Sequence, residues 1–314
     1  MQSKNKTRLT VVTLIVLTVT LFLMATDRVS RNNIFPYEMK QFQLENGLNV
    51  VAIPYDSPGI LAYYTIVRTG SRNEVEPGKS GFAHFFEHVM FRGTEKYPAD
   101  VYNKEMQLLG ADFNASTDDD WTRYYQVLPS SGLEKIIDIE SDRFQNLKYT
   151  EQAFKTEAGA ILGEYNKSMS NPFLAMFERI QELAFTTHTY GHTTIGYLQD
   201  IKDMPNQYAY SLDFYDRWYR PENCTVLVVG DFDYDQLQKL IKQYYSGWKR
   251  RDYKQAIQSE PEQTSERRAA IKWKSPTFPI LMTGYKTPGF SVQSKDYAAM
   301  DILGSYVFGE IEKG

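Results

Sequence analysis

The segment AHFFEHV at residues 83–89 places two histidines and a glutamate on an otherwise apolar stretch. Each residue of a helix turns by about 100°, so His84, Glu87 and His88 fall within an arc of about 100°. The surrounding phenylalanines indicate that such a helix is substantially buried, and buried imidazole and carboxylate groups need polar partners. A metal ion held by both imidazoles supplies one. The segment therefore predicts a buried helix that carries a metal site.

Zinc suits this pattern best. Two neutral imidazoles and one carboxylate leave a fourth tetrahedral position open for water, which is typical of a catalytic zinc site. A carboxylate beside that water can take its proton, so Glu87 is the candidate general base. The order H-x-x-E-H is the inverzincin signature. We therefore expect one Zn²⁺ per chain and a hydrolytic reaction.

The third ligand is expected in FKTEAGAILGEYNKS at residues 154–168. Glu157 and Glu164 lie about two turns apart, on one face of a predicted helix. The small residues between them let another helix approach closely. On this reasoning either glutamate can complete the site, and the residues alone do not choose between them.

The chain reads as strands and helices interspersed without a regular βαβ repeat, which predicts an α+β fold. Residues 42–55 indicate a hairpin, because two apolar runs flank Asn46-Gly47. A helix is expected from Ser80, as N-cap, to about Phe91. Further strands are predicted at 60–70, 111–117, 121–129 and 223–229. Further helices are predicted at 99–109, 131–146, 151–168, 172–186 and 233–246, and another ends at Tyr219.

Three segments are expected after the N-terminal region. Residues 34–249 are expected to form the zinc-binding catalytic domain. Residues 250–268 are charged and nearly free of apolar residues, so they are predicted to be a linker. Residues 269–314 begin a second unit, with strands at 269–273 and 279–285 and a helix at 294–308. Two strands and one helix cannot close a core of their own, so this second unit is expected to be incomplete.

Residues 1–30 carry a targeting signal. Basic residues at positions 4, 6 and 8 precede an uncharged run at 9–26, close to the shortest length that spans a bilayer. We predict an uncleaved signal anchor that attaches the protein to the membrane, with a cleaved signal peptide as the alternative. Both place the body outside the cytoplasm, either membrane-anchored or secreted and periplasmic. The net charge of −4 gives no footprint for nucleic acid.

With these motifs the chain resembles the pitrilysin/insulinase-type zinc metallopeptidases, which include the mitochondrial processing peptidases. The resemblance rests on HFFEH followed by Glu157 and Glu164, and on GADFNAST, HTYGHTTIGYLQDI and FYDRWYRPENCTVLVVGDFD. It implies a pitrilysin-like domain with a mixed sheet flanked by helices, followed by a second similar domain. It also implies that Glu164 joins His84 and His88 as zinc ligand, while Glu157 orients a zinc-bound imidazole.

The resemblance further implies a substrate. Extended peptides or unfolded proteins add as a strand to a sheet edge, and FNAST matches that edge, so Asn114 and Ala115 are candidate substrate contacts. A different kind of function stays open: a non-catalytic, family-like subunit or peptide-binding scaffold that works with a partner, as a homo- or hetero-oligomer.

His188 and His192 share the i, i+4 spacing, but the glycine between them favours a turn and structural hydrogen bonds over metal binding.

Overall fold

The computed structural model of this chain describes residues 35–308. The predicted signal anchor, with its apolar run at 9–26, lies outside that range. Among the described residues, no helix combines the length and the apolar character needed to cross a bilayer. Every strand and helix named below belongs to the unit of the chain that starts at Met39.

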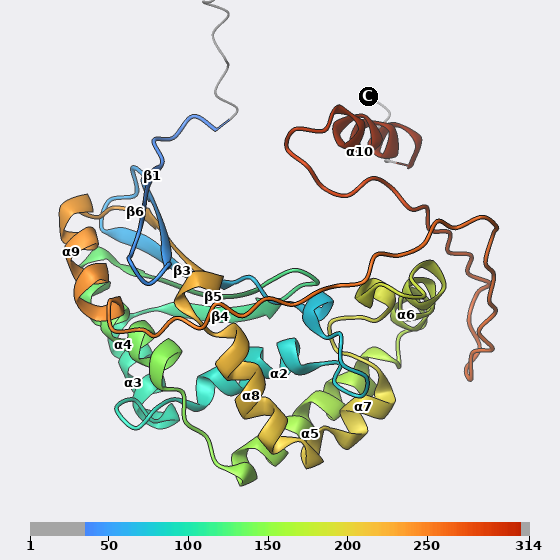
Figure 1. The fold of residues 1–314 in the computed structure, drawn as a ribbon, viewed down its shortest axis with the longest axis horizontal. Helices are drawn as coiled ribbons and strands as arrows, with labels where there is room; N and C mark the ends of the chain where they lie inside the picture. Colours follow the sequence, from blue (N-terminus) through green and yellow to red (C-terminus); the bar gives the residue numbers. More distant parts are fainter. Residues whose placement is uncertain (1–34, 309–314) are drawn as a thin grey trace, which may run out of the picture. The chain divides into compact units, whose positions relative to one another are not determined.

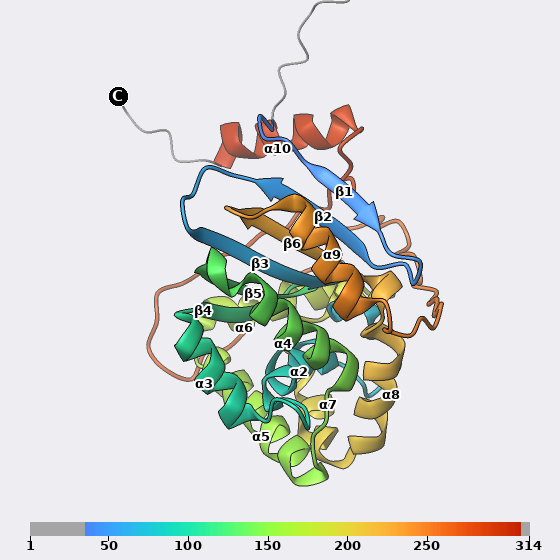
Figure 2. The ribbon, with the colours of Figure 1, turned by 90° about the vertical axis from the view of Figure 1, so that its left-hand side faces the viewer.

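A six-stranded mixed sheet organises this unit. Its strands are β1 (Lys40–Gln43), β2 (Asn49–Pro54), β3 (Ile60–Val67), β4 (Asp112–Thr117), β5 (Thr122–Pro129) and β6 (Cys224–Gly230). In space they follow the order β1-β2-β6-β3-β5-β4, which runs from top to bottom in Figure 2. Neighbouring strands pair antiparallel except β2 and β6, which are parallel. Of the strands in the described residues, the last along the chain therefore lies in the middle of the sheet.

The predicted hairpin at 42–55 is confirmed by the pairing of β1 with β2. Gly47 in its turn has φ +93°, a conformation that a residue with a Cβ atom rarely adopts. Asn46 donates hydrogen bonds to the carbonyl oxygens of Tyr245 (2.8 Å) and Trp248 (3.1 Å). The turn thus also ties the hairpin to the last helix before the charged segment.

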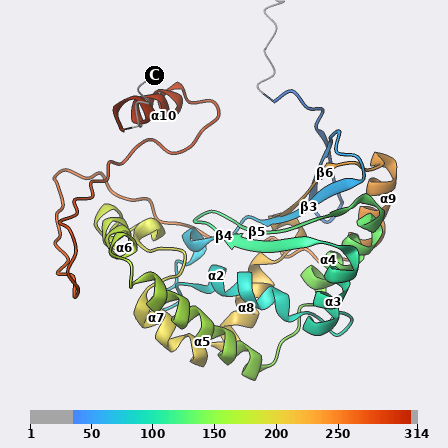
Figure 3. The ribbon, with the colours of Figure 1, turned by 180° about the vertical axis from the view of Figure 1, so that it is seen from behind.

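Helices cover one face of the sheet, the lower face in Figures 1 and 3. They are α2 (Phe82–Val89), α3 (Ala99–Leu109), α4 (Leu133–Asn146), α5 (Glu151–Ser168), α7 (Leu198–Asp203), α8 (Tyr208–Trp218) and α9 (Tyr234–Tyr245). Helix α6 (Pro172–Ala184) lies beside the sheet in Figures 1 and 3, and α10 (Lys295–Phe308) follows further along the chain. Residues of β3 and β6 alternate between buried and partly exposed. This alternation is expected for a sheet with only one face packed against a core. The predicted mixed sheet flanked by helices is confirmed.

The short helix α2 lies in the middle of the core, between the sheet and helices α5 and α8. Its three phenylalanines meet rings of those helices: Phe85 and Phe154 with centroids 4.9 Å apart, Phe86 and Phe214 at 5.1 Å, and Phe82 and Tyr210 at 4.7 Å. Burying each such side chain contributes about 1.5–3 kcal/mol. The polar residues of α2 face α5 and β4.

The N-cap residue predicted for α2 is wrong. Ser80 does not cap the helix, because its hydroxyl donates a 2.6 Å hydrogen bond to Asp200 Oδ2. The N-cap is Gly81, with φ +91° and no side chain to reach the helix. A Cβ atom at this position would stand 2.4 Å from the carbonyl oxygen of Ile195. Close packing against the loop before α7 therefore decides where the helix begins.

The strands predicted at 269–273 and 279–285 are also wrong, since neither segment forms a strand. A strand needs a neighbour to satisfy its backbone, and these segments pair with no strand of the described chain. The predicted helix at 294–308 is confirmed as α10. The predicted elements between residues 60 and 246 are confirmed within a few residues, but sequence reasoning missed α7, whose six residues are too few for a clear helical period.

The charged segment 250–268 contains no helix or strand. It is nevertheless attached to the body through Glu260. One oxygen of this carboxylate accepts backbone hydrogen bonds from Thr186 (2.9 Å), Thr187 (2.8 Å) and His188 (3.0 Å). These residues follow α6, so Glu260 fixes the segment to the end of that helix.

Candidate metal centre

His84 and His88 lie on the side of α2 that faces α5, as their i, i+4 spacing predicts. Their rings stand edge to face with centroids 4.9 Å apart. Nε2 of His84 lies 3.4 Å from Oε2 of Glu164 on α5, and Nε2 of His88 lies 3.5 Å from Oε1 of the same carboxylate. One ligand atom from each of the three residues lies within 4.8 Å of the others. Across residues 35–308, this is the one group of three or more His, Cys, Asp or Glu residues whose ligand atoms all lie that close to one another.

The donor set and the spacing fit zinc. Zinc bonds of about 2.0–2.2 Å in tetrahedral geometry place two ligand atoms roughly 3.4 Å apart. Both measured nitrogen–oxygen distances have this length, and both are longer than the 2.7–2.9 Å usual for a direct charge-assisted hydrogen bond. The two imidazoles and the carboxylate are therefore spaced as ligands of one shared ion.

The surroundings of Glu164 favour the ionised form of its carboxyl group. The neighbouring His84 holds the pKa of its carboxyl below the ordinary value; burial opposes this effect, and the nearby His88 adds to it. The carboxylate is anionic at neutral pH, which is the form that binds a metal.

Glu157 occupies a different place on the same helix. Its side chain is buried (5% exposed), with Oε2 3.5 Å from Nδ1 of His88 and Oε1 paired with the guanidinium of Arg92. Glu157 thus faces the nitrogen of His88 that points away from Glu164. Its predicted role in orienting a zinc-bound imidazole stays a prediction. Arg92 was not singled out from the sequence, although it follows His88 by one helical turn.

Glu87 contacts the sheet. Oε2 of Glu87 accepts a 2.7 Å hydrogen bond from the hydroxyl of Thr117, the last residue of β4. Figure 3 shows α2 beneath β4, with α5 further from the sheet. Sequence reasoning did not assign Thr117 a role, because the contact joins residues far apart in the chain.

The candidate substrate contacts lie on the same strand. In the described sheet β4 is an edge strand, and Asn114 and Ala115 pair with Tyr125 and Tyr124 of β5 on its inner side. The backbone N–H of Ala115 bonds to the side-chain oxygen of Asn114 at 2.9 Å. Asn114 is exposed and Ala115 is buried. Their role in substrate binding stays a prediction.

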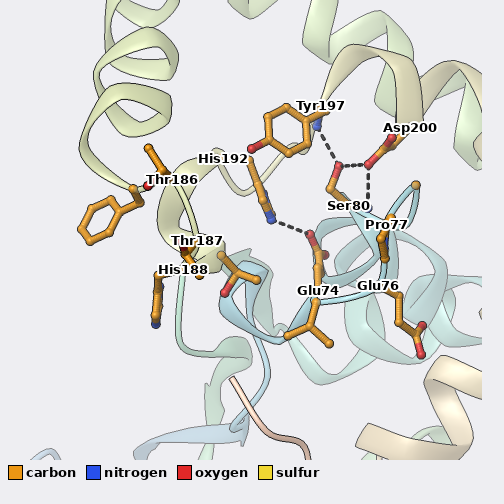
Figure 4. A pocket seen from close by; sticks show the side chains of 14 residues that line it. Glu74, Glu76, Pro77, Ser80, Thr186, Thr187, His188, His192, Tyr197 and Asp200 are labelled. Atoms are coloured by element: carbon orange, nitrogen blue, oxygen red, sulfur yellow. Dashed lines mark hydrogen bonds and ion pairs between the residues drawn. The ribbon is translucent and has the colours of Figure 1, made fainter. Parts of the chain in front are cut away.

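The other two histidines do not join the metal cluster. Nδ1 of His188 accepts a hydrogen bond from the backbone of Tyr190 (3.1 Å), and Nδ1 of His192 lies 2.9 Å from the carbonyl oxygen of Thr193. Structural hydrogen bonding, as predicted, accounts for both. Both line a pocket of about 350 Å³ near the N-terminus of α2, drawn in Figure 4.

A mixed sheet packed on helices that bring H-x-x-E-H to a second glutamate defines the class of zinc peptidases with the inverted motif. The sequence matches the family description "Insulinase (Peptidase family M16)" over residues 50–197 and "Peptidase M16 inactive domain" over residues 207–313. The chain belongs to the M16 peptidase family.

Named relatives agree with this assignment. Zinc protease PqqE of Helicobacter pylori is 31% identical over 272 residues, which cover 85% of this chain and 60% of the relative. A crystal structure of a protease from Helicobacter pylori shares 30% identity and a TM-score of 0.67, over 72% of this chain and 54% of that one. The periplasmic protease PqqL of Escherichia coli shares 26% identity and a TM-score of 0.63, over 72% of this chain and 26% of that one. This chain therefore spans part of the length of each of these relatives.

Proposed function

We propose that this chain carries the zinc centre of a metalloendopeptidase that hydrolyses extended peptides or unfolded proteins. His84, His88 and Glu164 would hold the ion. The observation that carries the proposal is the 3.4–3.5 Å spacing of both imidazoles from one carboxylate. Zinc, when bound, supplies a Lewis acid that brings the pKa of a water toward about 7.

The chain's own residues do the remaining work. Glu87 takes the proton of the attacking water and passes it to the leaving amide nitrogen. Thr117 holds the Glu87 carboxylate by the hydrogen bond at the end of β4 and fixes its direction. The open edge of β4 receives the peptide as an added strand, through backbone groups near Asn114 and Ala115. Glu157 and Arg92 keep the His88 ring oriented.

We also propose that the protein works outside the cytoplasm, in the periplasm if the cell has one. The targeting signal predicted at residues 1–30 and the periplasmic location of the Escherichia coli relative PqqL support this. Cell fractionation tests it, and recovery of the protein in the cytoplasmic fraction alone would contradict it.

The test of the metal site is zinc content of the full chain, measured by mass spectrometry after gel filtration. We expect about one zinc per wild-type chain and loss of it in Glu164→Gln. The matched control is Glu151→Gln, because Glu151 lies on the same helix and pairs with Lys155 at its exposed start. A folded wild-type chain without zinc would refute the proposal, as would equal zinc in Glu164→Gln.

Cleavage of a quenched, unstructured peptide tests the reaction separately. Zinc binding with cleavage supports the peptidase. Zinc binding without cleavage by the chain, alone or mixed with candidate partner subunits, favours the non-catalytic subunit.

A further inference from the structure

The first turn of the metal helix α2 is held by a glutamate from outside the helix. Glu74 is buried (4% exposed) and follows the short 3₁₀ turn Ser71–Asn73. Oε2 of Glu74 accepts a hydrogen bond from the backbone N–H of Gly81, and Oε1 accepts one from Ala83, both at 2.7 Å. Backbone N–H groups at a helix start have no partner within the helix. Glu74 satisfies two of them.

No local residue does this in its place. Gly81 at the N-cap has no side chain, and the hydroxyl of Ser80 is bonded to Asp200. In the part of the chain that the structure describes, no other side chain bonds the backbone N–H groups of residues 81–83. A helix of eight residues such as α2 is marginal by itself, so its ends depend on such outside bonds.

On its pocket side Glu74 faces His192. Oε2 of Glu74 lies 3.8 Å from Nε2 of His192, and Figure 4 shows the two side chains pointing toward each other. Nδ1 of His192 contacts the carbonyl oxygen of Thr193, so the tautomer with Nδ1–H donating leaves Nε2 as an acceptor. Burial raises the pKa of Glu74 to about 8 and lowers the pKa of His192. In both residues burial disfavours the charged form.

We infer that Glu74 is a positioning residue for the metal centre: by holding the N–H groups of Gly81 and Ala83, it fixes the first turn of α2 and with it the imidazole of His84. This inference rests on the proposed zinc site. His84 is the next residue after Ala83, whereas His88 lies one turn further into the helix. Loosening the first turn therefore displaces His84 first and changes the geometry offered to the metal.

The test is metal affinity, measured on the full chain by competition with a chelator. We expect Glu74→Ala to weaken Zn²⁺ binding about 10–100-fold, the range typical of groups that orient metal ligands. Glu74→Gln should weaken it less, because the amide oxygen still accepts one of the two N–H groups while the amide nitrogen opposes the other. The visible spectrum of bound Co²⁺ should change in both variants, since the spectrum reports ligand geometry.

The matched control is Glu76→Gln. Glu76 lines the same pocket but pairs with Arg217 and not with α2, so its loss can reduce thermal stability without moving His84. Wild-type affinity and Co²⁺ spectrum in a folded Glu74→Gln would overturn the inference, as would an equal loss of affinity in Glu76→Gln. Should Glu74→Ala not fold, Glu74→Gln decides. A wild-type chain that binds no metal refutes the zinc site itself, whereas unchanged Glu74 variants of a metal-binding chain refute only the positioning role.

Discussion

The ion pair of Arg143 and Glu140 on α4 gives the sharpest stability prediction. Nη2 of Arg143 lies 2.5 Å from Oε2 of Glu140, and the two residues are 1% and 0% exposed. The guanidinium also packs against four rings at 5.0–5.4 Å: Phe91, Tyr102, Tyr124 and Phe144. Burial raises the pKa of Glu140 even with Arg143 beside it. Arg143 provides the larger part of the compensation for this burial.

Arg143→Met removes the charge and keeps an apolar chain of similar length. Breaking a buried pair on one side costs about 3–5 kcal/mol, because a buried charge is left without compensation. The lost cation–π contacts act in the same direction, so we expect about 4 kcal/mol or more. With a urea dependence of about 3 kcal/mol per M, the unfolding midpoint falls by roughly 1.3 M. Equilibrium urea unfolding followed by circular dichroism measures this.

The double variant Arg143→Met/Glu140→Leu tests whether the uncompensated buried charge causes the loss of stability. It removes both charges, and replacing a buried pair by apolar residues is often neutral or stabilising. We expect it to recover most of the lost stability. A loss below about 1 kcal/mol in Arg143→Met, or a double variant less stable than the single one, would refute the reasoning.

Three further predictions concern the site and its surroundings. Glu87→Gln should retain zinc and lose about 10²–10⁴-fold in kcat, measured with a quenched peptide; retained turnover would remove Glu87 as the base. Burial raises the pKa of Glu260, but the backbone N–H groups of residues 186–188 outweigh this and bring it to about 2, so its stabilisation is present above about pH 4.5 and is lost as the pH falls toward 2. Limited proteolysis should show the segment around Glu260 becoming cleavable in acid, and at pH 7 in Glu260→Gln; equal protection of both proteins would contradict this. Gly81→Ala should lower the thermal midpoint more than Gly110→Ala, because both glycines have positive φ but only at Gly81 would the new Cβ lie 2.4 Å from a carbonyl oxygen.

The metal helix was predictable because its signal is local. The spacing of His84, Glu87 and His88 within one helical turn needs no knowledge of the fold. The choice between Glu157 and Glu164 was different, since both lie on the same face of α5 and a residue pattern treats them alike. In the structure they separate by where α5 meets α2: Glu164 faces the Nε2 atoms of both imidazoles, and Glu157 faces Nδ1 of His88.

Contacts made through the backbone or between distant segments were not predictable in the same way. Glu74 binds N–H groups, which every residue but proline carries, so no side-chain pattern reveals its partners. The apolar run at 223–229 predicted a strand but not its place between β2 and β3. Residues 269–273 and 279–285 have the apolar character of strands, yet no described strand pairs with them.

The central place of β6 has a consequence for synthesis on the ribosome. Strands β2 and β3 leave the ribosome early, but the strand that joins them is not made until residues 224–230. At about 5–20 residues per second, the roughly 160 residues between β3 and β6 take about 8–30 s. During that interval the inner edges of both strands lack their partner, and such edges are where nascent chains associate wrongly. All three proposed zinc ligands are also made before β6, so the residues that would hold the metal leave the ribosome before the sheet that supports them is complete.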